Sequence, residues 1–180
     1  MLHGRLDDLS AGERSRAACK PSCDACCHYL VPVSPAEARR LRERLTPASA
    51  ARLRAVRRQL ESAGLLELLD DVAAAPPDAR AWLSDAYADE RLACPFLEAG
   101  RCSVYADRPA ACRLHLSTDA AACHAGLGST LTPLRVNGRP ATRALAELEE
   151  GDWLPLISLN AVPDARPIRR SSLEWINELE

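Results

Sequence analysis

The sequence predicts a mainly α-helical, small single domain with two cysteine-rich loop segments and a short β-hairpin. Three observations lead to this class. All eight cysteines of the 180-residue chain lie in two blocks, residues 19–27 and 94–123. The sequence between the blocks repeats helix-start signals and the helical spacing of apolar residues. A chain of this length can bury one hydrophobic core, so we expect one domain over residues 1–180 with a helical insert at about 34–92.

The first part of the chain leads from a short helix or an ordered tail, residues 1–18, into the first cysteine block. The stretch YLVPVS after the block predicts a brief extended piece that Pro32 interrupts. Helical structure is expected from Ser34 onward, because Ser34 can cap a helix, Pro35 suits its first turn and Glu37 follows at the spacing of a capping box.

Further helices are expected in the insert. Thr46 and Pro47 repeat the start signal, and the helix that they open should end near Gly64, since glycine favours the left-handed turn after a helix. Residues 65–75 predict a third, short helix. The segment PPDARAWLSDAYADE, residues 76–90, predicts a fourth helix that its prolines open.

The second cysteine block predicts a small hairpin followed by a short helix. The stretch CPFLEAGRCSVY alternates like a strand on both sides of EAG, and ADRPAACR then indicates a turn into a helix. Cys123 and His124 follow in a polar, alanine-rich segment to which the pattern assigns no element. Beyond it the sequence indicates a turn and two helices, at Asn137-Gly138, residues 141–151 and residues 171–180.

Composition and charge argue against several classes of function. The formal net charge is −2 with 27% charged residues, so nothing favours nucleic acid or an anionic membrane as a partner. No apolar run approaches the roughly 18 residues that cross a bilayer, and Met1 to Arg16 does not resemble a signal peptide. We therefore expect a soluble cytoplasmic protein. In that reducing compartment, clustered cysteines are more often metal ligands or redox groups than disulfides.

The insert is locally basic because arginines repeat along its first two helices, at positions 39, 40, 42, 44, 52, 54, 57 and 58. A solvated helical face is the simpler interpretation of this pattern. A surface for an acidic partner is the alternative.

The cysteines predict a thiolate metal site with more than one role for its ligands. Cys23 and Cys26 form a knuckle that offers two ligands from one tight turn. Cys27 cannot easily face the same ion as Cys26, because adjacent side chains point in different directions. One thiolate of the pair therefore serves a second metal, bridges two metals or stays free, which favours a multinuclear site or two sites over a single zinc. The candidate ligands are Cys19, Cys23, Cys26, Cys27, Cys94, Cys102, Cys112 and Cys123.

The softness of the thiolate narrows the choice of metal. Thiolates select zinc, copper(I) or iron–sulfur over magnesium or calcium. His28, His115 and His124 lie beside or near cysteines and could add imidazole ligands, although a lone histidine more often hydrogen-bonds locally.

One cysteine spacing has a second interpretation. Cys19, Cys23 and Cys26 have the spacing of the three cysteines in radical S-adenosylmethionine enzymes. Those enzymes fold as a large barrel of alternating strands and helices. A short chain with a helical insert argues against that fold, so convergent spacing is the better account.

The two blocks together resemble a known family, the YkgJ-type cysteine-cluster proteins. Its pattern joins a CxxCxxCC motif to later C-P-x-L, C-x-[IV]-Y and R-P-x-x-C-R motifs. Here CDACC and CPFLEAGRCSVYADRPAACR carry the resemblance, with the later matches at Cys94, Pro95, Leu97, Cys102, Val104, Tyr105, Arg108, Pro109, Cys112 and Arg113. The chain differs in one respect, because three residues rather than two separate Cys19 from Cys23.

The resemblance implies zinc or iron chelation over residues 19–33 and 94–124, in a family often labelled Fe–S oxidoreductase. We expect an iron–sulfur cluster, with zinc as the alternative cofactor. Arg108 and Arg113 could donate hydrogen bonds to the sulfurs of a cluster or balance its charge. An ordinary arginine–carboxylate pair at a helix N-terminus is the alternative. Tyr105 and Phe96 are expected to form a small core beneath the site.

Three functions fit these observations. The first is a metal or cluster protein with redox or substrate chemistry, serving an unknown protein or electron-transfer partner. The second is a structural module in which zinc ties the two blocks together and the insert binds a partner. The third, a dithiol redox protein that cycles Cys23 and Cys26, needs only two of the eight cysteines. Other catalytic motifs, such as GxSxG and HExxH, are absent.

Overall fold

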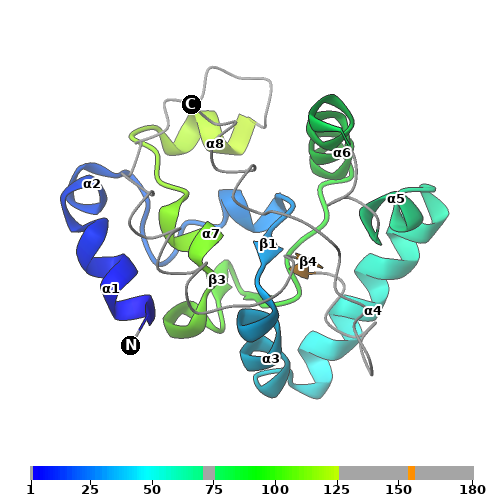
Figure 1. Cartoon of the computed structure of the whole chain (residues 1–180), viewed down its shortest axis with the longest axis horizontal. Helices are drawn as coiled ribbons and strands as arrows, with labels where there is room; N and C mark the ends of the chain where they lie inside the picture. The colour runs from blue at the N-terminus through cyan, green and yellow to red at the C-terminus, as the bar shows by residue number, and fades with distance from the viewer. Residues whose placement is uncertain (1, 71–75, 126–153, 157–180) are drawn as a thin grey trace.

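The computed structural model describes residues 2–70, 76–125 and 154–156. In these ranges the chain is mainly helical and has short antiparallel strand pairs, which confirms the predicted fold class. Figure 1 shows the helices arranged around a centre that contains α7 (Ala110–Leu114) and strand β1 (Pro32–Val33). None of the described helices is long and apolar enough to cross a membrane.

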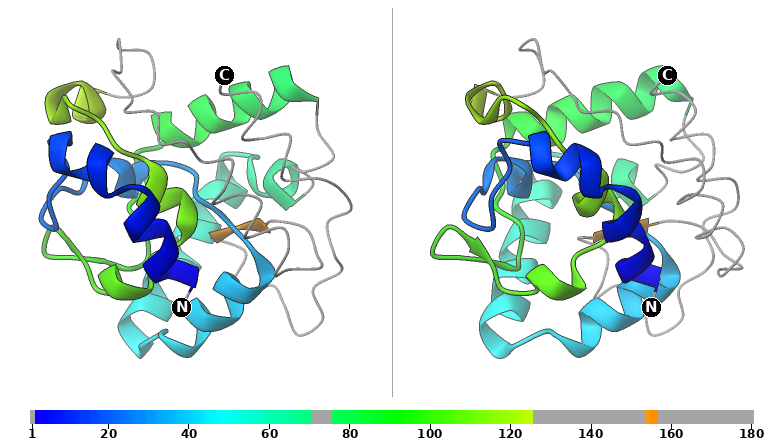
Figure 2. Two further views of the ribbon diagram at one scale, coloured as in Figure 1. Left: turned by 60° about the vertical axis from the view of Figure 1, so that its left-hand side comes forward. Right: turned by 90° about the vertical axis from the view of Figure 1, so that its left-hand side faces the viewer.

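Two short helices precede the first cysteine block, α1 (Leu2–Leu9) and α2 (Ala11–Arg16), so of the two expectations for residues 1–18 the helical one holds and the tail does not. Both views of Figure 2 place α1 against α7, and the two helices are in contact. The first cysteine block is irregular except for one turn of 3-10 helix, η1 (Ala25–His28). Its ligand candidates therefore lie on loop and turn backbone, as predicted.

Helices form where the local start and stop signals between residues 34 and 92 predict them. The Ser34 hydroxyl accepts from the Glu37 N–H over 3.3 Å, and Thr46 caps the next helix in the same way. Gly64 has φ +71°, the left-handed conformation that ends this helix. The last residues of the predicted third helix, 71–75, lie outside the described ranges. The insert contains α3 (Pro35–Glu43), α4 (Pro47–Ser62), α5 (Leu66–Asp70) and α6 (Pro77–Asp89).

The predicted hairpin is present in the second block. Strands β2 (Leu97–Glu98) and β3 (Arg101–Cys102) pair antiparallel, and Gly100 in the turn has φ +72°. A 3-10 turn, η3 (Tyr105–Asp107), then leads into α7.

The alanine-rich segment near Cys123 is a helix, α8 (Ala120–Ala125), which the sequence pattern did not indicate. The Asp119 carboxylate accepts from the Ala122 N–H over 3.0 Å, the contact of a helix-capping aspartate. An acidic cap followed by alanines, the best helix formers, is the local signal that could have located this helix.

The extended piece after the first block is β1, and its partner comes from far along the chain. It pairs antiparallel with β4 (Leu154–Pro155), with Val33 opposite Leu154. The Leu156 N–H also donates to the Val31 carbonyl over 2.9 Å. No local pattern indicates this pairing. The turn and the two helices predicted beyond residue 125 lie outside the described residues.

The hydrophobic core lies between the insert and β1 and extends to the second cysteine block. Leu41, Leu53, Leu60 and Leu69 of the insert are fully buried and pack in one cluster with Val33. Two residues of the second block, Phe96 and Cys94, join the same cluster, Phe96 as a buried member and Cys94 at its edge. The insert thus provides the wall against which part of the cysteine site is built.

Arginines of the insert hold the second block by ion pairs. Arg40 of α3 and Arg44, which follows the last residue of α3, both contact the carboxylate of Asp107 in η3, Arg44 over 2.9 Å. Arg52 of α4 pairs with Glu98 over 2.5 Å. Some of the arginines of the insert therefore form ion pairs within the chain. Neither the solvated face nor the surface for an acidic partner, the two interpretations of the arginine pattern, included this role.

The Asp107 contacts lead to a pH-dependent prediction. Burial opposes ionisation of Asp107, but the hydrogen bond and charge of Arg40, with the charge of Arg44, outweigh it and lower its pKa. A carboxyl whose pKa is lower in the folded state stabilises the fold above its unfolded-state pKa near 4, and this contribution is lost as the pH falls through the folded-state pKa. The side chains of Arg40 and Arg44 are 52% and 55% exposed, so water screens both ion pairs and limits their contribution to stability. We therefore expect Asp107→Asn to lower the free energy of unfolding by about 1 kcal/mol at pH 7.

Urea unfolding followed by circular dichroism, with wild type and variant in the same metal state, measures this effect. The difference should be full above about pH 5 and be lost progressively as the pH falls below about 4, through the lowered pKa of Asp107 in the folded state. Asp85→Asn removes an exposed carboxylate from α6 and should change little at any pH. An equal loss in both variants, or a difference that persists in acid, would contradict the assignment.

Candidate metal centre

The two cysteine blocks are joined directly through their backbones. The Cys94 N–H donates to the Cys27 carbonyl over 2.7 Å, and the Ala18 N–H donates to the Ser117 carbonyl over 2.8 Å. These bonds attach both the start and the end of the first block to the second. All eight cysteines lie in the described ranges and are free thiols, with Cys123 buried and the others half-buried.

Cys26 and Cys27 lie side by side on η1 with different surroundings. Cys27 donates a hydrogen bond to the Cys26 sulfur, which lowers the pKa of Cys26 to about 7 against the effect of burial, while the Arg108 charge adds to the lowering. The pKa of Cys27 is raised by the same hydrogen bond, by burial and by the charges of Cys26, Cys94 and Cys112. Cys26 is therefore the member of the pair that is ready to act as a thiolate.

Three thiols of the second block interact electrostatically with this pair. Burial raises the pKa of Cys94 to about 12, and the charges of Cys102 and Cys26 add to the shift. Burial also raises the pKa of Cys102 and of Cys112, and the negative charge of the Cys26 thiolate raises both pKa values further. Cys26, Cys27, Cys94, Cys102 and Cys112 thus form one electrostatically linked group, which we call the inner group.

The remaining thiols form a second group, the outer group, of Cys19, Cys23 and Cys123. Burial raises the pKa of Cys123, opposed by a hydrogen bond from Ser117, and the charges of Cys19, Cys23 and Cys26 raise it further. The Cys19 sulfur lies 3.8 Å from the Ser117 carbonyl, to which it donates. Cys26 is the thiol that influences both groups.

The thiols are neighbours rather than a closed coordination shell. Within the described part of the chain, no three His, Cys, Asp or Glu side chains form a group that could hold a metal ion in this arrangement. Thiolate sites commonly close when the metal binds, because their ligands must also lose protons. The assignment of the eight cysteines as ligands stays a prediction.

Arg108 and Arg113 differ in what they contact. Arg113 donates through Nη1 to Asp7 over 2.5 Å, through Nε to the Arg108 carbonyl over 3.0 Å and through Nη2 to the Ala106 carbonyl over 2.5 Å. All three nitrogens are engaged by protein oxygens, as in the arginine–carboxylate alternative. Arg108 lies 3.8 Å from the centre of the Tyr105 ring, and its charge lowers the pKa of Cys26 and Cys102.

The expected small core beneath the site is present only in part. Phe96 is buried in the main core, but Tyr105 is 38% exposed. The prediction for Tyr105 is wrong, because one face of its ring is covered by the Arg108 guanidinium rather than by apolar side chains.

The three candidate histidines lie around the groups without forming a ligand set. His115 packs edge-on against the Tyr29 ring, with the ring centres 5.6 Å apart, and burial lowers its pKa. The Nδ1 of His28 lies 3.3 Å from the Arg91 carbonyl. The Nε2 of His124 lies 3.9 Å from Asp24. His28 thus has a hydrogen-bond partner in the protein, although one that is 63 residues away in the chain.

A cavity of about 530 Å³ lies beside the outer group. Tyr29 forms part of its wall and donates to the Cys123 carbonyl over 2.5 Å. The remaining lining comes from η1, the C-terminal end of α6 and α8: Ala25, His28, Asp85, Ala88, Asp89, Arg91, Cys123, His124 and Ala125. Cys123 is the member of the outer group that lines this cavity.

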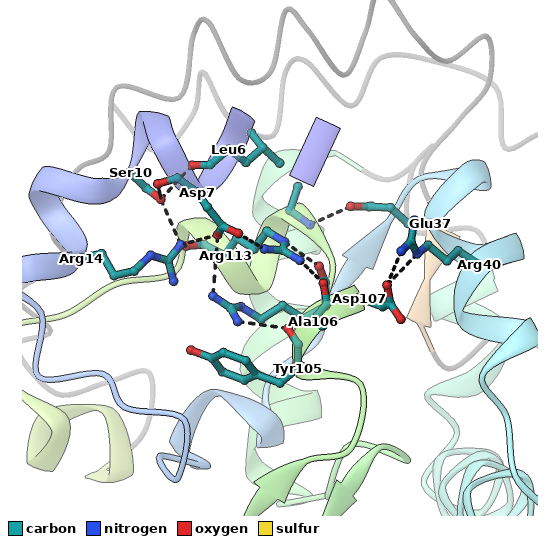
Figure 3. Close-up of polar contacts among 12 residues, drawn as sticks. Leu6, Asp7, Ser10, Arg14, Glu37, Arg40, Tyr105, Ala106, Asp107 and Arg113 are labelled. Atoms are coloured by element: carbon teal, nitrogen blue, oxygen red, sulfur yellow. Dashed lines mark hydrogen bonds and ion pairs between the residues drawn. The ribbon is translucent and has the colours of Figure 1, made fainter. Parts of the chain in front are cut away.

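Two acidic residues support the site although sequence patterns gave them no such role. Asp7 of α1 contacts Arg113 and Arg14, as Figure 3 shows. Glu37, expected only to cap its own helix, also accepts from the Ala110 N–H at the start of α7 over 2.7 Å. The capping box located Glu37, whereas no signal in the sequence marks Asp7.

Comparison with known proteins gives one match. No curated protein and no solved structure matches the chain significantly. A family model described as "CxxCxxCC: Putative zinc- or iron-chelating domain" matches residues 18–126, more than half of the chain, and includes both cysteine blocks. The match begins after α2 and ends with α8, so it contains the inner and outer groups entirely. This chain therefore belongs to the CxxCxxCC family of zinc- or iron-chelating domains.

Proposed function

We propose that the two cysteine blocks jointly hold a multinuclear metal centre, an iron–sulfur or other multinuclear iron centre with a redox role. The observation that carries this proposal is the position of Cys26, whose charge reaches Cys94, Cys102 and Cys112 on one side and Cys123 on the other. A thiolate between two groups of thiols is suited to bridge metals or to serve adjoining sites.

The donor set fits such a centre. Eight thiols exceed the four that one tetrahedral ion takes, and their sulfur atoms are the soft ligands that iron–sulfur clusters and zinc prefer. The inner group would supply up to five ligands and the outer group three. A bound iron–sulfur centre would supply one-electron transfer.

The surrounding charges also suit a thiolate centre. Arg108 is 8% exposed and provides a positive charge next to Cys26 and Cys102. A buried cation stabilises the deprotonated thiols and the net negative charge of a thiolate-bound cluster, and it would raise the reduction potential. The cavity beside Cys123 offers a route for a small electron donor or substrate.

A structural zinc module is the second candidate, and the junction between the blocks favours it. The Cys94–Cys27 and Ala18–Ser117 backbone bonds place both blocks side by side, where zinc could fasten them. Some exposed arginines of α3 and α4, such as Arg39 and Arg54, have no described acidic partner. In a zinc module these side chains would be available to an acidic protein.

Elemental analysis with a visible absorption spectrum, on protein purified without oxygen, distinguishes these functions. Iron with acid-labile sulfide and a broad absorption band that bleaches on reduction is the expected result. Stoichiometric zinc without colour would replace the redox centre with the structural module. Protein that retains neither metal, and takes up neither after anaerobic reconstitution, would contradict both.

A further inference from the structure

We propose that Asp7 of α1 is a positioning residue of the metal centre: it holds Arg113 and thereby fixes the segment that carries Arg108 and Cys112. The inference rests on the proposed metal centre. The family match begins at residue 18, so it assigns no role to α1.

One carboxylate faces three arginines in this region, and Figure 3 labels two of them, Arg14 and Arg113. Asp7 accepts from Arg113 over 2.5 Å and from Arg14 over 2.9 Å, and the Arg108 Nη2 lies 4.0 Å away. The side chains of Arg113 and Arg108 are only 3% and 9% exposed, while that of Asp7 is 43% exposed. Among the described residues, Asp7 is the only carboxylate that pairs with these two buried arginines.

Arg113 uses its remaining nitrogens to hold the backbone that precedes α7. It donates to the carbonyls of Ala106 and Arg108, and it adjoins Cys112 in the sequence. Without the Asp7 charge, Arg113 would be a buried cation with no counter-charge, which is strongly unfavourable. Its guanidinium would then move toward water and release both carbonyls.

The consequence reaches the thiols through Arg108. This side chain donates to the Tyr105 carbonyl over 3.1 Å and stacks on the Tyr105 ring, so its place depends on the same turn. The carbonyls that Arg113 and Arg108 hold lie between Cys102 and Cys112 in the chain, and Cys112 is the residue before Arg113 in α7. Asp7 therefore fixes the stretch of the second block that carries Cys112.

The test is a cobalt(II) titration of the full chain without oxygen, since cobalt bound by thiolates gives charge-transfer bands and d–d bands that report ligand geometry. We expect Asp7→Asn to weaken cobalt affinity about tenfold or more, as for other groups that support metal ligands, and to alter the d–d bands. Asp7→Glu keeps the charge and should restore most of the affinity. Asp8→Asn removes the exposed neighbouring carboxylate and should bind like wild type.

A second control separates positioning from general stability. Val56→Ala shortens a buried side chain of α4, far from the Asp7 contacts in the sequence, and lowers stability by a cavity effect. The temperature is set so that all proteins are equally folded by circular dichroism. If Val56→Ala weakens cobalt binding as much as Asp7→Asn does, Asp7 only stabilises the fold and the inference is wrong.

The remaining outcomes also decide the question. Wild-type affinity and spectrum in Asp7→Asn would overturn the role of Asp7 and leave the metal centre standing. A wild-type chain that binds no cobalt would overturn both. If Asp7→Asn does not fold, Arg113→Lys takes its place, because lysine keeps the positive charge but cannot donate to both the Ala106 and Arg108 carbonyls. Weaker cobalt binding with altered d–d bands then supports positioning, and wild-type affinity and bands overturn it.

Discussion

Replacing Cys26 with serine is expected to weaken metal binding on the order of 100-fold. A four-ligand structural zinc site gains about 10–16 kcal/mol on binding, so one thiolate accounts for about 3 kcal/mol, or two powers of ten in affinity. We expect Cys26→Ser to cause at least this loss of affinity. The hydrogen bond from Cys27 and the charge of Arg108 make Cys26 the more acidic thiol of the pair, and so the one more readily deprotonated for metal binding. Competition with a chelator of known affinity measures the change.

The adjacent variant, Cys27→Ser, should behave differently. Cys27 is influenced by the thiols of the inner group, whereas Cys26 also acts on Cys123. We therefore expect Cys27→Ser to lower the number of metals per chain while part of the metal stays bound, and Cys26→Ser to affect the whole centre. Metal analysis after gel filtration distinguishes partial from complete loss.

A matched control for both variants is available in the same loop. Ser22→Ala changes an exposed hydroxyl next to Cys23 and should keep the full metal content. If either serine variant of the adjacent pair also keeps the full metal content and stability, the inference that the two thiols have separate roles is wrong. Identical partial losses in both would likewise contradict it.

The parts of the fold that the sequence predicted correctly depend on residues close together in the chain. The Ser34–Glu37 capping box, the Gly64 stop and the hairpin turn at Gly100 each involve a few neighbouring positions. The β1–β4 pairing joins Val33 to Leu154, and short extended pieces carry no information on their distant partners. The α8 helix differs, because its start signal is local but weak: a single capping aspartate, Asp119, precedes a run of alanines without a helical apolar pattern.

The same distinction holds for the candidate site. Cysteine spacing indicated which residues to consider, but their division into an inner and an outer group depends on how the blocks fold together. Arg108 and Arg113 look alike in the sequence, yet the charge of Arg108 acts on Cys26 and Cys102, whereas the nitrogens of Arg113 are held by Asp7 and two carbonyls. The difference comes from Asp7, which is 106 residues from Arg113 and contacts it through the packing of α1 on α7.

Glu37→Ala is expected to lower the free energy of unfolding by about 3 kcal/mol, or the melting temperature by roughly 10 °C. The Glu37 side chain is buried, and its Oε2 accepts from the Ser34 N–H over 3.0 Å while its Oε1 accepts from the Ala110 N–H over 2.7 Å. Alanine leaves both donors without this acceptor in a buried site, at a cost of about 1–3 kcal/mol each. The loss separates α3 from the start of α7, the helix that carries Cys112.

Two variants on the same helix make this measurement specific. Glu37→Gln keeps one carbonyl oxygen but presents an amide N–H₂ to one of the two donors, so it should lose about half as much stability. Glu43→Ala removes an exposed carboxylate from the end of α3 and should change the free energy of unfolding by less than about 0.5 kcal/mol. Thermal unfolding at pH 7 ranks the three variants by their loss of stability, which should be largest for Glu37→Ala and smallest for Glu43→Ala. If Glu37→Ala loses no more than Glu43→Ala, the contact from Glu37 to α7 does not form in solution, and α3 does not hold the second cysteine block through this residue.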